Sequence, residues 1–95
     1  MIKPTTDYAN EKFLITDEPV MKLAMDVMEI LNKIDKISIK GKGETCPATV
    51  SVANIITQNF LNSITKTEKI HVDSEISDDG RLISTIEIII AKISN

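Results

Sequence analysis

The sequence feature that most restricts the possible folds of this chain is its C-terminal segment "LISTIEIIIAKI", residues 82–93. It is nearly continuously apolar from Ile86 to Ile90, and an Asp-Gly pair at residues 79–80, a strong hairpin signal, precedes it. Before that turn, residues 69–77 alternate apolar and polar side chains, which predicts a half-exposed strand. We therefore expect a central strand here, covered on both faces, or covered on one face and joined to a partner on the other.

The segment after residue 16 predicts a first helix. Asp17 and Glu18 precede Pro19, and proline fits the first turn of a helix, where carboxylates face the positive end of the helix dipole. Apolar side chains then recur at spacings of three and four, which predicts a core-facing stripe: Val20, Leu23, Ala24, Val27, Leu31 and Ile34. A methionine row widens this stripe: Met21, Met25 and Met28. Such a methionine row can also form a binding surface for varied partners, but because rows at helical spacing usually face a core, we expect these methionines to be buried.

A second helix is predicted over residues 47–63, with Pro47 in its first turn. The apolar positions that we expect to face the core are Val52, Ile55, Ile56 and Phe60. The other face carries small, uncharged side chains: Ala48, Thr49, Ser51, Asn54, Thr57 and Gln58. Such a face can lie against another protein surface without burying a charge.

Two shorter segments complete the predicted fold. "KFLIT", residues 12–16, predicts a short strand, and "DKISIKG", residues 35–41, alternates as a second strand that Gly41 and Gly43 end. The resulting order β-α-β-α-β-β predicts a two-layer α/β (α+β) fold, in which a mixed four-stranded sheet carries two helices on one face. The uncovered face or edge of that sheet favours a dimer.

The composition sets outer limits on organisation and function. A chain of 95 residues allows one domain, and we expect a flexible N-terminal arm at residues 1–11 ahead of that domain at residues 12–95. The 11 basic and 14 acidic residues give a net charge of −3, the wrong sign for binding polyanions by bulk charge. No apolar run reaches the roughly 18 residues of a membrane span, and a single cysteine forms no internal disulfide. We therefore expect a cytosolic protein.

A glycine-lysine loop, "GKGETC" at residues 41–46, invites a nucleotide-binding interpretation. Its spacing argues against both common motifs, because it has no third glycine for a dinucleotide fingerprint and no Gly-Lys-Ser/Thr for a phosphate loop. The loop also belongs to the one basic stretch of the chain, residues 33–43, where four lysines and one acid give a local charge of +3. At this point a solvated surface run and a binding site for a polyanion both stay open.

The residues predict neither an enzyme nor a metal or cofactor site. His71 lies on a predicted strand among carboxylates, with no serine or cysteine at a catalytic spacing. Cys46 at a helix start is a reactive thiol at most, because it has no catalytic partner. The acidic residues around the hairpin match no calcium loop and are expected to be solvated: Asp73, Glu75, Asp78 and Asp79.

Several motifs together resemble the Alba family of small archaeal chromatin and RNA-binding proteins. The motifs are "LI..EPVM" at residues 14–21, "ISIKGKG" at residues 37–43, "ITQNFL" at residues 56–61, "DDGR" at residues 78–81 and "ISTIEIIIAK" at residues 83–92. The last is the most specific. The resemblance implies a fold like the C-terminal domain of translation initiation factor three, and a symmetric dimer formed partly through the second helix and the last strands.

The resemblance also implies a nucleic-acid-binding surface shaped like a saddle, with basic loops at its centre and two hairpin arms. Lys40 and Lys42 match basic positions of the family's loop after the second strand, and Arg81 matches an arginine at the hairpin turn. These three residues are the expected contacts with the backbone of DNA or RNA. The expected protein is a non-enzymatic, chromosome-associated or cytoplasmic binder that forms a homodimer, or a heterodimer with a basic Alba paralogue.

Other positions depart from the family pattern towards acidic or neutral residues. Asp17 and Glu18 stand where the family has paired lysines, and Glu44 stands at a further basic position of the loop. The second helix lacks the family's positive residues at Ala48, Thr57 and Asn59. This divergent acidic pattern leaves an alternative open: a paralogue with reduced nucleic-acid binding that acts as the structural or heterodimer partner of a basic Alba subunit.

Overall fold

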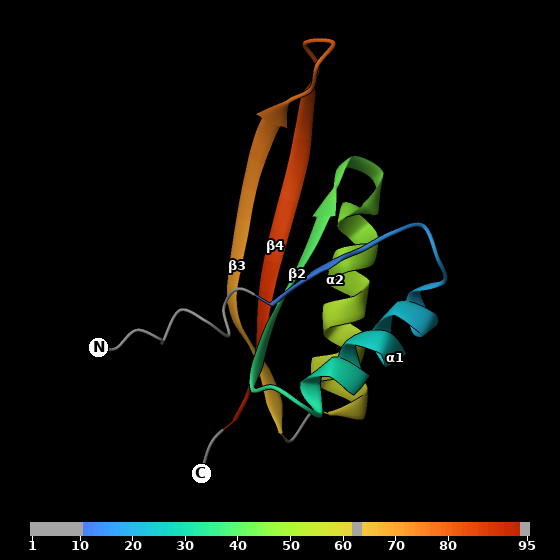
Figure 1. Cartoon of the computed structure of the whole chain (residues 1–95), viewed down its shortest axis with the longest axis vertical. Coiled ribbons are helices and arrows are strands. Elements are labelled where there is room, and N and C mark those ends of the chain that lie inside the picture. The colour runs from blue at the N-terminus through green and yellow to red at the C-terminus, as the bar shows by residue number, and fades with distance from the viewer. Residues whose placement is uncertain (1–10, 62–63, 94–95) are drawn as a thin grey trace, which may run out of the picture.

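The computed structural model describes residues 11–61 and 64–93, and it has the predicted order of elements (Figure 1). The strands are β1 (Lys12–Leu14), β2 (Lys36–Lys42), β3 (Thr65–Ile76) and β4 (Leu82–Lys92). The helices are α1 (Val20–Leu31) and α2 (Cys46–Asn54), with the short 3-10 turn η3 (Gly43–Thr45) before α2 and the π-helical segment η4 (Ile55–Phe60) after it. The predicted N-terminal arm lies outside the described residues except for Glu11, whose carbonyl oxygen accepts a hydrogen bond from the Ser38 amide.

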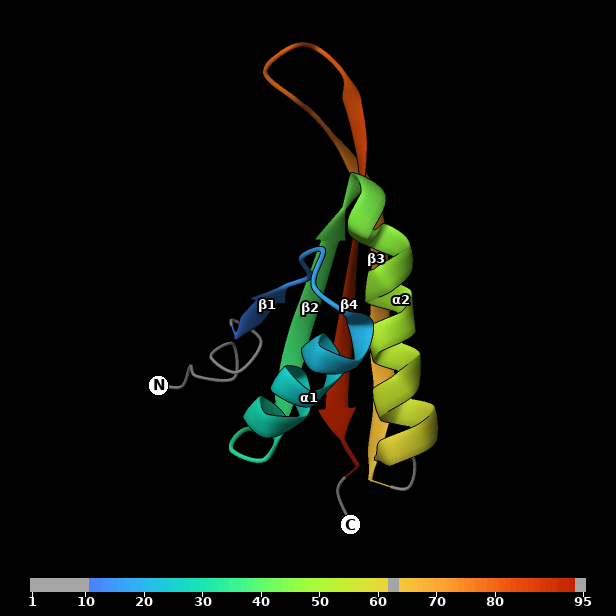
Figure 2. The same ribbon diagram turned by 90° about the vertical axis from the view of Figure 1, so that its right-hand side faces the viewer.

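The four strands form one mixed sheet in the order β1-β2-β4-β3. β1 runs parallel to β2, while β4 runs antiparallel to both β2 and β3. β4 is therefore the central strand that the apolar C-terminal segment predicts. Both helices lie on one face of the sheet (Figures 1 and 2), which confirms the predicted two-layer α+β architecture. We call the opposite sheet face the open face.

The hydrophobic core lies between the sheet and the two helices. It is built from the residues that the two periodicities place inwards: Ile37 and Ile39 of β2, Ile88 and Ile90 of β4, Leu23, Ala24, Val27 and Leu31 of α1, and Val52, Ala53 and Ile56 of α2 and η4. Each large aliphatic side chain buried in this way stabilises the fold by about 1.5–3 kcal/mol relative to exposure. Branched aliphatics supply most of the core volume.

Two apolar predictions on the helices are wrong. Met21 and Met25 are exposed, because they lie beside the narrower core stripe of α1 and no other described element covers them. Phe60 is also exposed, at the last residue of the π-helical segment.

Gly41 sets how closely α2 approaches the sheet. A Cβ atom at this position would lie 2.0 Å from Thr49 Oγ1, and the Thr49 hydroxyl itself donates to the Thr45 carbonyl oxygen at 2.8 Å. Thr49 is accordingly buried rather than part of the predicted outer face of the helix. The strand continues to Lys42, and Gly43 makes the turn into η3 with a φ of 53°. This contact fixes the end of β2, where Lys42 lies.

The hairpin of β3 and β4 extends past the rest of the molecule, as Figures 1 and 2 show. β2 ends where Lys42 pairs with Thr85, so beyond that point β4 is paired only with β3 and its other edge has no neighbouring strand. We call the projecting part, residues 74–84, the hairpin arm. Its tip is the predicted Asp-Gly turn, in which Gly80 has a φ of 86° and the Ser77 amide donates to the Arg81 carbonyl oxygen at 2.8 Å.

Candidate nucleic-acid interface

Strand alternation decides which side chains reach the open face. Because Ile37 and Ile39 face the helices, Ser38, Lys40 and Lys42 project from the other side of β2. The pairing register places the following residues of β4 and β3 on the same side: Thr85, Glu87, His71, Asp73 and Glu75. The predicted lysines and half of the hairpin's acidic residues therefore share one surface.

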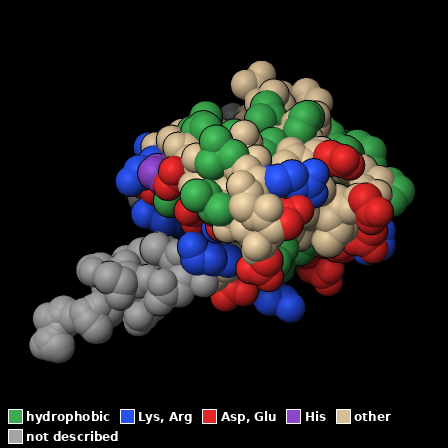
Figure 3. Space-filling view, turned by 90° about the horizontal axis from the view of Figure 1, so that it is seen from above, with side chains coloured by type: hydrophobic (Ala, Val, Ile, Leu, Met, Phe, Trp, Pro, Cys, Tyr) green, Lys and Arg blue, Asp and Glu red, His purple; other side chains and the backbone are tan. Residues whose placement is uncertain are grey.

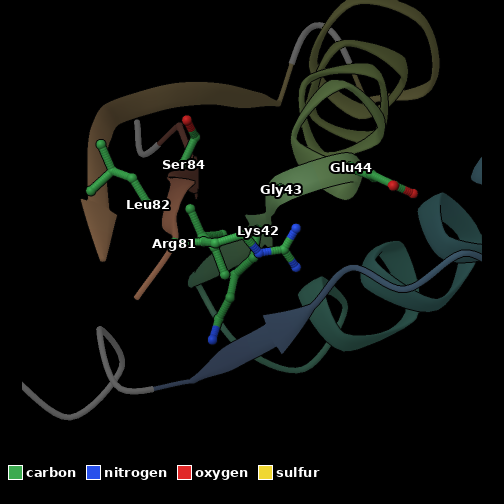
Figure 4. A pocket seen from close by; sticks show the side chains of 7 residues that line it. Lys42, Gly43, Glu44, Arg81, Leu82 and Ser84 are labelled. Atoms are coloured by element: carbon green, nitrogen blue, oxygen red, sulfur yellow. The ribbon is translucent and has the colours of Figure 1, made fainter. Parts of the chain in front are cut away.

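Lys42 and Arg81 line one groove of about 550 Å³ between the end of β2 and the base of the hairpin arm. The other residues of its lining are Gly43, Glu44, Leu82, Ile83 and Ser84. In Figure 4 the side chains of Lys42 and Arg81 occupy the same region, although they come from segments far apart in the sequence. The Glu44 side chain points away from both of them, towards α1, so its carboxylate does not occupy the space between the two cations.

Lys40 lies on the open face but not in this groove. It is half-buried on β2 and pairs across the sheet with Glu87 of β4. It belongs to none of the ion pairs found among residues 11–61 and 64–93. Its positive charge nonetheless contributes to lowering the pKa of both Glu75 and Glu87, so it lies near two carboxylates. Of the three predicted cations, the fold therefore places Lys42 and Arg81 in one groove and Lys40 outside it.

A carboxylate from the hairpin already engages Lys42. Its Nζ atom lies 2.7 Å from Glu75 Oε2, on strands that are separated by β4, so the pair spans the central strand on the open face. The hydrogen bond and the charge of Lys42 together hold the pKa of Glu75 below its ordinary value. Glu75 therefore carries its negative charge at neutral pH.

Arg81 is engaged within the turn of the hairpin. Its Nε atom donates to Asp79 Oδ2 at 3.1 Å, and its backbone amide donates to Ser77 Oγ at 3.2 Å. The Ser77 hydroxyl also donates to Asp79, and this bond is the main reason that the pKa of Asp79 is lowered. Asp79 is therefore part of what shapes the turn, in addition to neutralising Arg81.

Two more lysines on the open face pair with acids across an intervening strand. Lys12 of β1 lies 2.9 Å from Glu87 of β4, and Lys36 of β2 lies 2.8 Å from Glu68 of β3. Glu87 also accepts a hydrogen bond from the Ser38 hydroxyl, and this bond, followed by that from Lys12, lowers its pKa. On the surface seen in Figure 3, basic and acidic side chains are interspersed rather than gathered into one basic patch.

The sequence analysis missed these cross-strand ion pairs. Alternation was a usable signal, because it puts Glu75 on the side opposite Val72 and Ile76. The missing information was the strand order, since Lys42 and Glu75 meet only if β2 and β3 flank β4.

The other candidate groups are surface or packing residues. His71 is exposed, with its Nε2 atom 3.6 Å from Asp73 Oδ2, and together with Lys69, Glu87 and Ile89 it lines a hollow of about 240 Å³ on the open face. The Cys46 thiol lies within hydrogen-bonding distance of the Gly41 and Ser84 carbonyl oxygens. Among the described residues, no three His, Cys, Asp or Glu side chains are placed to hold a metal ion. None of the described helices is long and apolar enough to cross a membrane.

Comparison with known proteins identifies the family. The Alba family model matches residues 11–74, about two thirds of the chain. The chain belongs to the Alba family. The solved structure of Alba from Thermoplasma volcanium is 29% identical and superposes with a TM-score of 0.74, covering 85% of this chain and 99% of that one. ALBA1 from Trypanosoma brucei, at 14% identity, shares the fold with a TM-score of 0.72, over 88% of this chain and 70% of its own.

Membership in the Alba family implies a nucleic-acid-binding, chromatin-type role. Alba proteins are generally non-enzymatic binding proteins, and the described residues contain no arrangement that indicates catalysis. The acidic residues at the family's basic positions are exposed here. Asp17 and Glu18 precede α1, where Glu18 accepts a hydrogen bond from the Thr16 hydroxyl and lies 3.7 Å from the ammonium of Lys22.

Proposed function

We propose that this chain is a dimeric, non-enzymatic protein that binds the phosphate backbone of DNA or RNA at the groove of Lys42 and Arg81, with Lys40 as a nearby third cation. The observation that carries the proposal is the convergence of two cations from distant segments on one groove, in a member of the Alba family. Phosphate contacts position a protein on nucleic acid without reading its sequence. The proposed role is therefore structural, in chromatin or in a ribonucleoprotein, in the cytoplasm or on the chromosome.

The dimer is supported by apolar side chains that this chain leaves uncovered. α2 packs over β2 and β4, whereas β3 meets the helix layer mainly at η4. The helix-facing side of the hairpin is therefore exposed, at Ile70, Val72, Ile76 and Leu82. The adjoining surface of α2 and η4 carries no charge, and its exposed residues include Val50, Ser51 and Asn54 of α2 and Gln58 of η4. A second copy laid against this surface buries apolar area without burying an unpaired charge.

The second candidate function is that of an acidic paralogue that binds nucleic acid weakly and acts as the partner of a basic Alba subunit. The observation that favours it is the pairing of both groove cations with carboxylates, Lys42 with Glu75 and Arg81 with Asp79. Co-expression with a basic family member tests it. A stable mixed dimer supports this candidate, and recovery of this chain only as a homodimer contradicts it.

Fluorescence anisotropy of labelled duplex DNA and single-stranded RNA tests the leading proposal. Three phosphate contacts per subunit give a dimer a slope of log K against log salt near −5, with each contact counting about −0.9. We expect binding at low salt that weakens steeply towards 150 mM, and loss of most of this dependence in Lys40→Glu/Lys42→Glu. An unchanged affinity in that variant would overturn the assignment of the site. No binding to either ligand above micromolar protein favours the second candidate.

A further inference from the structure

We propose that Glu75 is a built-in competitor for the phosphate position at Lys42, and that it sets the affinity of this protein for nucleic acid. The inference rests on the proposed function, since it concerns how the same groove is regulated. It assigns an inhibitory role to a residue of the hairpin arm that the sequence analysis treated as solvated.

The first step is geometric. The distance of 2.7 Å between Lys42 Nζ and Glu75 Oε2 is that of a charge-assisted hydrogen bond. A phosphate oxygen bound to the same ammonium needs the same distance and the same donor directions. A nucleic-acid backbone that contacts Lys42 must therefore displace Glu75 or share the ammonium with it.

The second step concerns access and charge. The side chains are 53% exposed for Lys42 and 44% exposed for Glu75, so the pair opens to solvent and a phosphate can reach it. Removing Glu75 from Lys42 leaves a carboxylate beside the incoming phosphate, and two like charges repel. The carboxylate thus weakens binding both by occupying Lys42 and by its own charge.

The third step is that Glu75 and Lys42 lie on different parts of the fold. Lys42 ends β2 in the body of the fold, whereas Glu75 lies in the hairpin arm, and their ion pair bridges β4 near Thr85. The charge of Glu75 therefore reaches Lys42 only while the arm keeps its position relative to the end of β2. Nothing else in the described fold requires an acid there, because Glu75 makes no other ion pair among residues 11–61 and 64–93.

Glu75→Gln is a clean test, because it keeps the size and the hydrogen-bonding oxygen while it removes the charge. Asp79 is less suitable, since it also holds the turn through Ser77 and Arg81. Asp78→Asn is the matched control: it removes one negative charge from the tip of the same arm, and Asp78 is in no ion pair among the described residues. Circular dichroism and thermal unfolding verify that all variants are folded.

The measurement is the affinity for labelled duplex DNA at several salt concentrations. An exposed ion pair corresponds to a factor of about 1.4–5 in an equilibrium constant, so one site on each subunit gives a dimer about 2- to 30-fold. We expect Glu75→Gln to tighten binding by that factor, and to steepen the salt slope by up to about 1.8. Asp78→Asn changes affinity by less than about twofold if its charge acts only at long range. In a Lys42→Gln background, Glu75→Gln keeps only the effect of its own charge, which is expected to be no larger than that of Asp78→Asn.

The outcomes separate the two claims. If Lys42→Gln weakens binding while Glu75→Gln matches Asp78→Asn, the inference is wrong and the proposed function stands. If the wild type fails to bind but Glu75→Gln binds, the inference is supported, and Glu75 blocks the site completely in the wild type. If wild type and Lys42→Gln bind identically, or if no variant binds at all, both the site and the inference are overturned.

Discussion

β3 and β4 run through both the body of the fold and the hairpin arm, yet their side chains differ in burial between the two parts. Ile88 of β4 lies under the helices and is 2% exposed, whereas Ile76 of β3, on the same face of the sheet, is 72% exposed. Beyond the bulge between Thr67 and Lys69, side chains alternate regularly in both parts. The difference comes from what lies above the strands, because the helices cover β4 in the body, whereas the arm continues beyond the start of α2 (Figure 2).

The charged side chains show the same division. In the body, Glu87 accepts hydrogen bonds from both Ser38 and Lys12, and the bond from Lys12 connects β1 to β4 across β2. In the arm, Glu75 has one partner, Lys42, and that partner belongs to the groove that we propose binds phosphate. Glu87 in the body therefore supports the fold, whereas Glu75 in the arm is the acid that we propose regulates the site.

The largest predicted effect separates the body from the arm by stability. Ile88→Ala removes a fully buried side chain and is expected to cost about 2–5 kcal/mol of unfolding free energy. Ile76→Ala, measured at protein concentrations below dimerisation, is expected to cost less than about 0.5 kcal/mol. Urea unfolding of the two variants compares them directly. Equal losses of stability would mean that other residues of the same chain bury the Ile76 side chain.

Replacing a glycine is also expected to cost more stability in the body than in the arm. Gly41→Ala places a Cβ atom 2.0 Å from Thr49 Oγ1, so it forces α2 away from β2 and is expected to cost about 1–3 kcal/mol or more. Gly80→Ala at the arm's tip meets no atom within 4 Å and carries only the strain of its positive φ, about 1 kcal/mol. Thermal unfolding checks the order of the two losses, and the reverse order would contradict the close contact at Gly41.

The apolar side of the hairpin is expected to matter for assembly rather than for folding. Val72→Ser removes exposed apolar area beside α2 and is expected to weaken the dimer by at least about tenfold, because each dimer contains two copies of the change. Met25→Ser is the control, since Met25 is also exposed but lies on α1. Sedimentation equilibrium gives the dimer constants. Equal effects of the two variants would contradict this position of the dimer interface.

The smallest predicted effect is the pH dependence of stability. The pKa of Glu87 is lowered by its hydrogen bonds to Ser38 and Lys12, so its carboxylate stabilises the fold above the ordinary glutamate pKa of about 4.3, and this contribution is lost as the pH falls through the lower folded value. Glu87→Gln is expected to reduce stability at pH 7 by less than about 1 kcal/mol and to flatten the acid side of the curve. A steeper acid side would contradict the assignment.

The sequence predicts what depends on neighbours along the chain. Alternation and the Asp-Gly turn correctly give the hairpin, and helical spacing correctly gives Leu23 and Val27 as core residues. It fails where burial depends on an element elsewhere. Met25 and Phe60 both have the right spacing, but no other described element covers them, and Phe60 ends a π-helical segment that the residue pattern does not predict.

The candidate site also contains features that the sequence predicts and features that it does not. Lys40, Lys42 and Arg81 were found by their match to the family, and that choice of residues stays a prediction. The carboxylate partners of Lys42 and Arg81 differ in how far they are predictable. Asp79 lies two residues from Arg81 in the same turn, whereas Glu75 reaches Lys42 only through the order of the sheet, which one sequence does not determine.

The most direct test of the central claim is the salt dependence of duplex DNA binding in Lys42→Gln compared with Lys22→Gln. Both variants remove one positive charge, but Lys22 lies on α1 and pairs with Asp26, away from the groove lining. If Lys42 contacts phosphate, its loss reduces the magnitude of the salt slope by up to about 1.8 for a dimer, while Lys22→Gln leaves the slope nearly unchanged. Identical slopes in the two variants would contradict a phosphate site at this groove.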